Sequence, residues 1–125
     1  SLVRTTKQTL LIVSLQPLIV VGNKTFLAEL LTLAGGVNIV GSSLSTFPTL
    51  SREAVVIANP DVIIVMSDVL TDTNELQKFF PEWSTLRAFR TRQIFRINSD
   101  LIARPGPRAV DGLAHLHKII QQGHE

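Results

Sequence analysis

Cysteine is absent from the sequence, and its absence excludes two classes of protein. A disulfide scaffold needs paired cysteines, and a cysteine nucleophile needs the thiolate. Charged residues are also few: they make up 18% of the 125 residues, against 45% hydrophobic residues. Disordered chains combine low hydrophobicity with high charge, so this composition predicts a folded chain with room for one domain.

No apolar run is long enough to cross a bilayer. The longest, residues 9–21, is interrupted by Ser14, Gln16 and Pro17, and it falls short of the about 20 residues that a transmembrane helix needs. The first residues, Ser1 to Arg4, do not resemble a signal peptide, which begins with a basic segment. We therefore expect either a cytosolic protein or a chain whose N-terminal part has been removed.

Motifs of common enzymes are missing as well: there is no GxGxxG, phosphate-binding loop, GxSxG or HExxH. His115 and His117 are two residues apart in an expected helix and point in different directions, whereas Asp111 and His115 share a face. Because no third ligand is evident nearby, the pair predicts a surface ion pair rather than a metal site. A small α/β enzyme stays a hypothesis, but no nucleophile–base pair supports it.

Basic residues are concentrated in one part of the chain, although the net charge is only +2. Six of the eight arginines lie between Arg87 and Arg108, where Asp100 is the only acid. This region is open to two interpretations: a binding site for a polyanion such as nucleic acid, or a solvated surface. Exposed aromatics interleaved with the arginines, which nucleic-acid binding would favour, are missing.

Apolar patterning predicts four strands that alternate with helices, in the order β-β-α-α-β-α-β-α. The expected strands are Thr9–Leu15, Leu18–Val21, Asp61–Met66 and Gln93–Ile97. The expected helices are Lys24–Ala34, Ser51–Ala58, Asp72–Phe80 (with further helical turns in Trp83–Phe89) and Arg108–Gln122, and the longer loops are Gly41–Pro48 and Asn98–Pro107. This alternation is typical of an α/β layered domain.

In open α/β sheets, ligands bind outside the carboxyl ends of the strands. Three loops that follow expected strands are therefore candidate sites: Ser14–Pro17, Ser67–Thr71 and Asn98–Arg104. Phe47 lies in a polar loop before a proline, where it is either an anchor for the loop or an aromatic platform at a cleft.

Two further features each have a structural and a functional interpretation. The segment Arg104–Arg108 is rigid because of its two prolines, and its arginines either form a solvated helix entry or bind a carboxylate or phosphate. Glu53, in the first turn of a helix, either stabilises that helix or awaits a basic partner.

Five stretches that follow one another along the chain resemble the C-terminal lobe of one family. The family is that of the periplasmic binding proteins for vitamin B12, ferric siderophores and haem, which deliver metal chelates to ABC importers. The stretches are Gly22–Phe26, Leu33–Asn38, Pro48–Glu53, Asn59–Ile64 and Arg104–Arg108. They are spread over residues 22–108, which is most of the chain.

The resemblance implies a single three-layer α/β lobe with a mostly parallel sheet flanked by helices. Residues 1–125 would form the second lobe of a two-lobed protein, with the N-terminal lobe and the linking helix having no counterpart here. The implied function is that of the substrate-binding component of an ABC importer, which is not an enzyme and needs no cofactor. The implied location is the periplasm, or a lipid anchor on the outer face of the cytoplasmic membrane.

The resemblance also assigns roles to individual residues. Phe47 matches an aromatic that the B12-binding member places against its ligand, Arg104 matches a cleft arginine, and Asp100 matches a cleft acid. Leu101 departs from the pattern, because an aromatic stands there in the B12-binding member. Ser67 and Asp68 are candidates by their position after a strand.

Partners follow from the same resemblance. Glu53 matches the glutamate that each lobe offers to basic residues of the membrane permease. The expected partners are thus a metal chelate (ferric siderophore, cobalamin or haem) and an ABC permease, with no nucleic acid. The face left by the missing lobe would also allow a homodimer.

Overall fold

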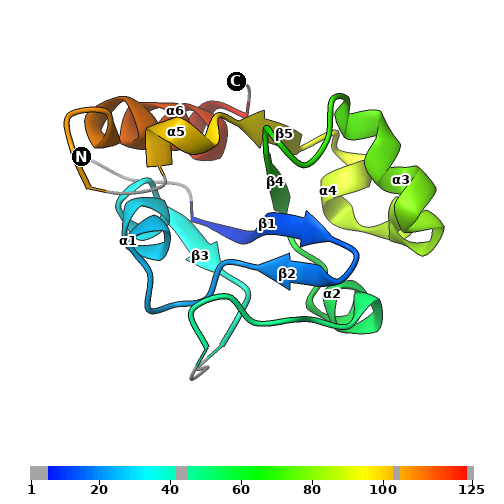
Figure 1. The fold of residues 1–125 in the computed structure, drawn as a ribbon. Helices are drawn as coiled ribbons and strands as arrows, with labels where there is room; N and C mark the ends of the chain where they lie inside the picture. Colours follow the sequence, from blue (N-terminus) through cyan, green and yellow to red (C-terminus); the bar gives the residue numbers. More distant parts are fainter. Residues whose placement is uncertain (1–5, 42–44, 103–104, 124–125) are drawn as a thin grey trace.

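The protein is seen here in a computed structural model that describes residues 6–41, 45–102 and 105–123. Within these ranges a five-stranded sheet lies between two groups of helices (Figure 1). Its strands are β1 (Lys7–Leu15), β2 (Leu18–Val20), β3 (Gly36–Asn38), β4 (Val62–Met66) and β5 (Ile94–Ile97).

The strand order of the sheet is β2-β1-β4-β5, and β3 pairs with the first residues of β1. β1 pairs in parallel with β3 and β4, and β4 pairs in parallel with β5, whereas β2 returns antiparallel to β1. All five residues of β4 are buried, as expected of a strand covered on both faces. The predicted mostly parallel sheet is therefore confirmed.

One face of the sheet is covered by α1 (Phe26–Leu33), α5 (Ser99–Ile102) and α6 (Ala109–Gln122). Thr25 caps α1, because its hydroxyl oxygen accepts a hydrogen bond from the Ala28 N–H at 3.0 Å. The core on this face contains Leu11, Ile64, Phe95 and Ile97 from the strands and Leu27, Leu31, Leu116 and Ile120 from the helices.

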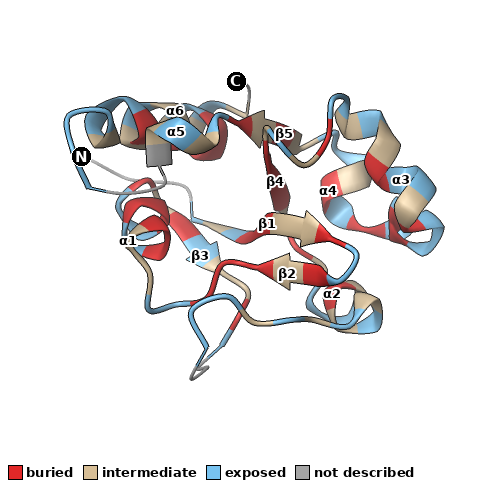
Figure 2. Ribbon diagram, in the orientation of Figure 1, coloured by how far each residue is buried: buried red, intermediate tan, exposed pale blue. Residues whose placement is uncertain are grey.

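The opposite face carries α2 (Arg52–Ala58), η1 (Thr73–Glu75), α3 (Leu76–Phe79), η2 (Pro81–Thr85) and α4 (Arg87–Arg90). The predicted capping box is present: the Asp72 side chain accepts a hydrogen bond from the Glu75 backbone N–H, and the Glu75 side chain accepts one from the Asp72 backbone N–H. Figure 2 marks the buried residues in red, on the strands and on parts of these helices. Those on this face include Leu10, Ile12, Ile63, Val65, Val55, Leu76, Phe80 and Trp83.

Two elements differ from the sequence prediction. The sequence does not predict β3, because Gly35 and Gly36 indicate the end of a helix and three residues are too few to carry a strand pattern. β3 forms by pairing with β1, which is distant from it in the sequence. Residues 98–107 were predicted to be a loop, yet they contain α5. Asn98 begins this single turn: its side-chain oxygen accepts from the Asp100 N–H, and its carbonyl accepts from the Leu101 N–H.

The remaining predicted elements are confirmed to within a few residues, and so is the three-layer α/β architecture. The longest helix in the described ranges is α6, at 14 residues. None of the described helices combines the length and the apolar character that a membrane crossing requires.

Candidate functional site

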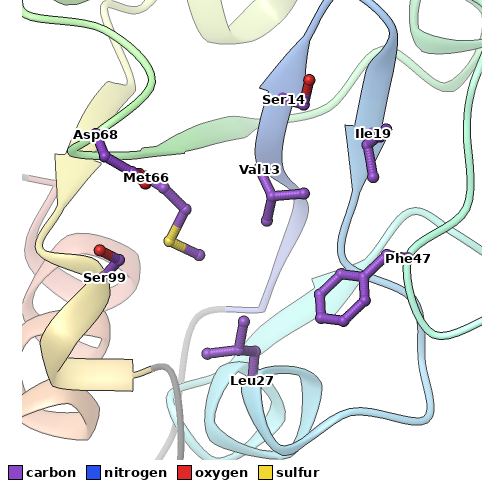
Figure 3. A pocket seen from close by; sticks show the side chains of 8 residues that line it. All are labelled: Val13, Ser14, Ile19, Leu27, Phe47, Met66, Asp68 and Ser99. Atoms are coloured by element: carbon purple, nitrogen blue, oxygen red, sulfur yellow. The ribbon is translucent and has the colours of Figure 1, made fainter.

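A cavity of about 490 Å³ lies at the carboxyl ends of the parallel strands (Figure 3). This is the edge where open α/β sheets bind ligands, and all three loops that follow expected strands lie at or beside it. Its lining in the described part of the chain is mostly apolar, with two hydroxyls and one carboxylate: Val13, Ser14, Ile19, Leu27, Phe47, Met66, Asp68 and Ser99.

The end of β1 contributes two of these side chains through an irregular pairing with β2. Ile12 pairs with Val20, but Ser14 pairs with Ile19, so that Val13 is an extra residue on β1. Bulges of this kind redirect side chains and are common beside functional sites. The Ser14 hydroxyl donates a hydrogen bond to the Pro17 carbonyl at 2.8 Å, which leaves its oxygen available as an acceptor.

Phe47 lies at the cavity because its loop runs along β2. The Val20 N–H donates to the Pro48 carbonyl at 3.1 Å, and Thr49 forms an antiparallel bridge with Ile19. These backbone contacts hold the loop, while 46% of Phe47 stays exposed. Of the two interpretations of Phe47, the geometry thus favours an aromatic surface at the cavity over a buried anchor.

Gly22 is required for this arrangement, because the loop passes directly over it. Its N–H donates to the Thr46 carbonyl at 2.8 Å. A Cβ at this position would lie 2.7 Å from the Ser45 carbonyl oxygen and 2.9 Å from that of Thr46. Both are backbone atoms, which cannot move aside as the end of a side chain can.

We therefore expect Gly22→Ala to displace the loop that carries Phe47. The expected cost is about 1–3 kcal/mol of unfolding free energy, as for other forced overpacking, and urea denaturation measures it. Gly41→Ala is the matched control, because a Cβ there meets no atom within 4 Å. Equal stabilities of the two variants would contradict the close approach.

The turn after β4 places Asp68 at the cavity. The Ser67 N–H donates to the Ile97 carbonyl at 2.9 Å, and the Val69 N–H donates to the Met66 carbonyl at 3.0 Å. The Arg96 guanidinium donates to the Ser67 carbonyl at 2.7 Å. Three hydrogen bonds therefore hold the turn in place.

The other predicted ligand residues are distributed differently. Ser67 is half-buried and its side chain does not belong to the described lining. Asp100 is exposed on α5 beside Ser99, which does line the cavity. Arg104 lies outside the described residues.

Six of the lining residues were not among the predicted site residues: Val13, Ser14, Ile19, Leu27, Met66 and Ser99. Ser14 begins the candidate loop Ser14–Pro17, so its position carried a signal. Ser99 fell within a loop that the sequence marked as a candidate, so its position carried a signal. The four apolar residues had none, because an apolar side chain that lines a cavity has the same pattern in sequence as one that fills the core.

Glu53 lies on α2, away from the cavity lining, and is exposed. The neighbouring Arg52 pairs with Glu82 and also donates to the Phe79 carbonyl at 3.1 Å. The Trp83 indole N–H donates to the Arg52 carbonyl at 3.1 Å, which ties the first turn of α2 to η2. The hydrogen bond from Arg52 lowers the pKa of Glu82.

A large apolar side chain stands one turn after Glu53. Ile57 is 86% exposed, and its spacing of four residues puts it on the same side of α2 as Glu53. The outer side of α2 therefore presents a carboxylate next to an isoleucine, on a helix whose start is held by Arg52 and Trp83.

Among the described arginines between Arg87 and Arg108, two are engaged within the lobe. Arg87 pairs with Asp61 at 2.8 Å, and Arg96 is turned toward the Ser67 carbonyl. Within the described ranges, no group of three or more metal-ligating side chains comes together.

Known proteins resemble this chain in sequence and in fold. The sequence profile of the family described as "Periplasmic binding protein" matches residues 2–101. The vitamin B12-binding protein of Vibrio parahaemolyticus is 28% identical over 99 residues, which cover 78% of this chain and 34% of that protein. An ABC transporter substrate-binding lipoprotein of Bacillus subtilis is 27% identical, covering 79% of this chain and 30% of that protein. The chain thus spans about a third of the length of these curated relatives.

Solved structures share the fold. The periplasmic vitamin B12 binding protein of Vibrio cholerae has a TM-score of 0.80 at 24% identity, over 94% of this chain and 45% of that one. A periplasmic solute-binding protein of Staphylococcus epidermidis has a TM-score of 0.84 at 24% identity, over 96% and 47%. A periplasmic heme-binding protein in complex with two hemes has a TM-score of 0.79 at 21% identity, over 93% and 44%.

These findings confirm the resemblance noted in the sequence. The location that it implied agrees with the description of the matched family as periplasmic and with the lipoprotein among the relatives. The profile covers well over half of the residues, and the fold agrees over nearly the whole length. The chain belongs to the periplasmic binding protein family.

Proposed function

We propose that this chain is the C-terminal lobe of a two-lobed substrate-binding protein of an ABC importer. Its cavity is one half of a site for a metal chelate: cobalamin, a ferric siderophore or haem. The other half belongs to an N-terminal lobe that residues 1–125 do not include. Three of the proteins named above are described as binders of vitamin B12 or heme, which supports this class of ligand.

The observation that carries the proposal is the composition of the cavity and its place in the fold. Ligand sites are mostly apolar, with a few directed polar groups, and they lie at the carboxyl ends of parallel strands. Here Phe47 supplies an exposed aromatic face, and Asp68 and the two serines supply the polar groups. A large chelate needs such a platform and no nucleophile.

Further contacts are proposed around the cavity. Asp100 and Arg104 would approach the ligand from the segment after β5, and Ser67 would contribute by holding the Asp68 turn. Glu53, with Ile57 beside it, would dock on the permease. Glu53 stays available for such a partner, because the neighbouring Arg52 is already paired with Glu82.

The alternative function, polyanion binding through Arg87–Arg108, is less well supported. Two of its arginines are already engaged within the lobe, Arg87 by Asp61 and Arg96 by a backbone carbonyl.

A homodimer through the cavity face would also cover the apolar lining. Light scattering of the chain distinguishes this dimer from a monomer.

The substitution Phe47→Ala tests the proposed ligand platform. We expect it to weaken chelate binding by the two-lobed protein by about 30-fold, since buried aromatic contacts are typical hot spots worth about 2 kcal/mol or more. Calorimetric titration with cyanocobalamin, ferrichrome and haem measures it. Phe47→Tyr keeps the ring and should stay within a few-fold of the unaltered protein. Equal affinity of the Phe47→Ala variant would contradict the assignment.

A further inference from the structure

We infer that Ile57 is the apolar anchor of the docking surface on the outer side of α2, and that the permease carries an apolar pocket for it next to the cation that meets Glu53. This inference rests on the proposed function and deepens it, because it names the chemistry of the partner's surface. It comes from the composition of α2, from the exposure of its side chains and from the contacts that hold both of its ends.

The helix α2 has the composition of a buried helix, yet the lobe covers only one side of it. After Arg52 and Glu53 it contains five apolar residues in succession and no further polar one. Helices at a protein surface carry polar residues on their outer side, whereas helices that are apolar all round are usually covered all round. Within α2, however, Val55 is the only buried residue, and Ile57 is 86% exposed. The composition of the outer side therefore favours a partner over solvent.

Three residues of α2 are exposed: Glu53, Ile57 and Ala58. A single exposed apolar side chain is common on protein surfaces, but within α2 no polar residue follows Glu53 to surround Ile57 with polar neighbours. Side chains four residues apart in a helix have their Cβ atoms about 5–6 Å apart. A partner would thus meet one carboxylate and one large apolar side chain next to each other.

The charge that α2 offers to a partner is negative, because Arg52 is engaged within the lobe. Its guanidinium pairs with the Glu82 carboxylate through two nitrogens and also donates to the Phe79 carbonyl at 3.1 Å. The guanidinium carbon lies 4.9 Å from the centre of the Phe80 ring. Glu53 therefore keeps its charge for a partner, and electrostatic complementarity requires a cation opposite it.

Both ends of α2 are fixed to neighbouring elements. At the start of the helix, the Trp83 indole N–H donates to the Arg52 carbonyl at 3.1 Å. At its end, Asn59 adopts a left-handed conformation with φ of 48°, and its side-chain oxygen accepts a hydrogen bond from the Arg87 N–H at 2.8 Å. A surface that is held in one orientation before binding loses little conformational entropy when it binds.

The partner that fits this surface has an apolar pocket and a basic residue at a matching distance. Burial of Ile57 would supply binding energy, while the pairing of Glu53 would fix the register of the two proteins. The negative headgroups of an anionic bilayer surface would instead repel Glu53. A protein therefore fits better than a lipid surface, and under the proposed function the protein that accepts the chelate is the permease.

The test measures docking of the two-lobed protein on its permease and ATPase in nanodiscs by biolayer interferometry. We expect Ile57→Ala to raise the Kd of docking about tenfold, because it removes an apolar side chain that fills a pocket. Ile57→Leu keeps the apolar volume and should stay within about threefold of the unaltered protein. The affinity for the chelate should not change, since Ile57 lies outside the described cavity lining.

Leu33→Ala is the matched control. Leu33 is an isomer of isoleucine that is 70% exposed, and it lies on α1, which covers the opposite face of the sheet. Its truncation should leave docking unchanged, and equal weakening by Leu33→Ala and Ile57→Ala would overturn the inference.

Two further results would also overturn it. One is an unchanged docking Kd in the Ile57→Ala variant while Glu53→Arg weakens docking, which would leave docking through Glu53 in place. The other is binding of the unaltered protein to nanodiscs without permease that is lost in the Ile57→Ala variant, which would identify lipid as the occupant. Failure of the unaltered protein to dock at all would remove the proposed function, and the inference with it.

Discussion

Replacement of Trp83 by alanine is expected to cost about 3–5 kcal/mol of unfolding free energy, the range seen for buried aromatic truncations. Trp83 is completely buried and stacks on Phe80 with ring centroids 4.1 Å apart. Its indole N–H also donates to the Arg52 carbonyl, so the substitution leaves both a cavity and a buried acceptor without its donor. The midpoint and slope of urea denaturation measure this loss.

Two variants separate the causes of that loss. Trp83→Phe keeps most of the stacked ring and removes the donor, so it should cost less than half as much as Trp83→Ala. Phe47→Ala removes an aromatic ring of which 46% is exposed, and we expect it to change stability far less. Unfolding of the Trp83→Ala and Phe47→Ala variants at the same urea concentration would contradict the contribution of Trp83 to the stability of the core.

The second large effect is expected at α2, the helix that we propose docks on the permease. Glu53→Arg should lower the initial rate of chelate uptake at least about tenfold when the two-lobed protein is reconstituted with its permease and ATPase in vesicles. Close charge pairs across protein interfaces couple by about 1.5–7 kcal/mol, and the substitution turns attraction to a basic partner into repulsion. Ligand affinity should not change, because Glu53 lies outside the described cavity lining.

Glu29 offers a matched control for this experiment. It is also an exposed acid in the first turn of a helix, α1, but it has no role in the proposed docking. Glu29→Arg should therefore leave uptake close to that of the unaltered protein. Equal uptake by the Glu53→Arg and Glu29→Arg variants would refute docking through Glu53, and a parallel loss of ligand affinity would reassign Glu53 to the ligand site.

Much of the fold could be predicted from local patterns. β4 and the middle of β1, residues 10–13, are continuous apolar runs. α1 and α2 begin after capping residues and have apolar sides at helical spacing. These features are local consequences of burial and hydrogen bonding, so the chain carries them in a readable form. β3 could not be read in this way, because a three-residue strand depends on its pairing with β1.

The candidate site was predictable only in part. Each of the three loops after the strands carries a residue that lines the cavity, and Phe47 and Asp68 are among the lining residues. Ser67 was chosen for the same position in sequence as Asp68, yet its side chain does not reach the lining. Consecutive residues in a turn point in different directions, and the hydrogen bonds of that turn decide which of them faces a ligand.

The amino-acid order alone sets the layered α/β class and the family, because both depend on apolar periodicity and on short stretches in a given sequence. The tertiary structure decided which groups meet. The bulge at Val13 turns a strand side chain toward the cavity, and the contact of the 46–49 segment with β2 keeps Phe47 exposed. The hydrogen bond from Arg96 to the Ser67 carbonyl holds the turn that places Asp68 at the cavity. Each of these depends on pairing between segments far apart in the chain, and no local pattern encodes that pairing.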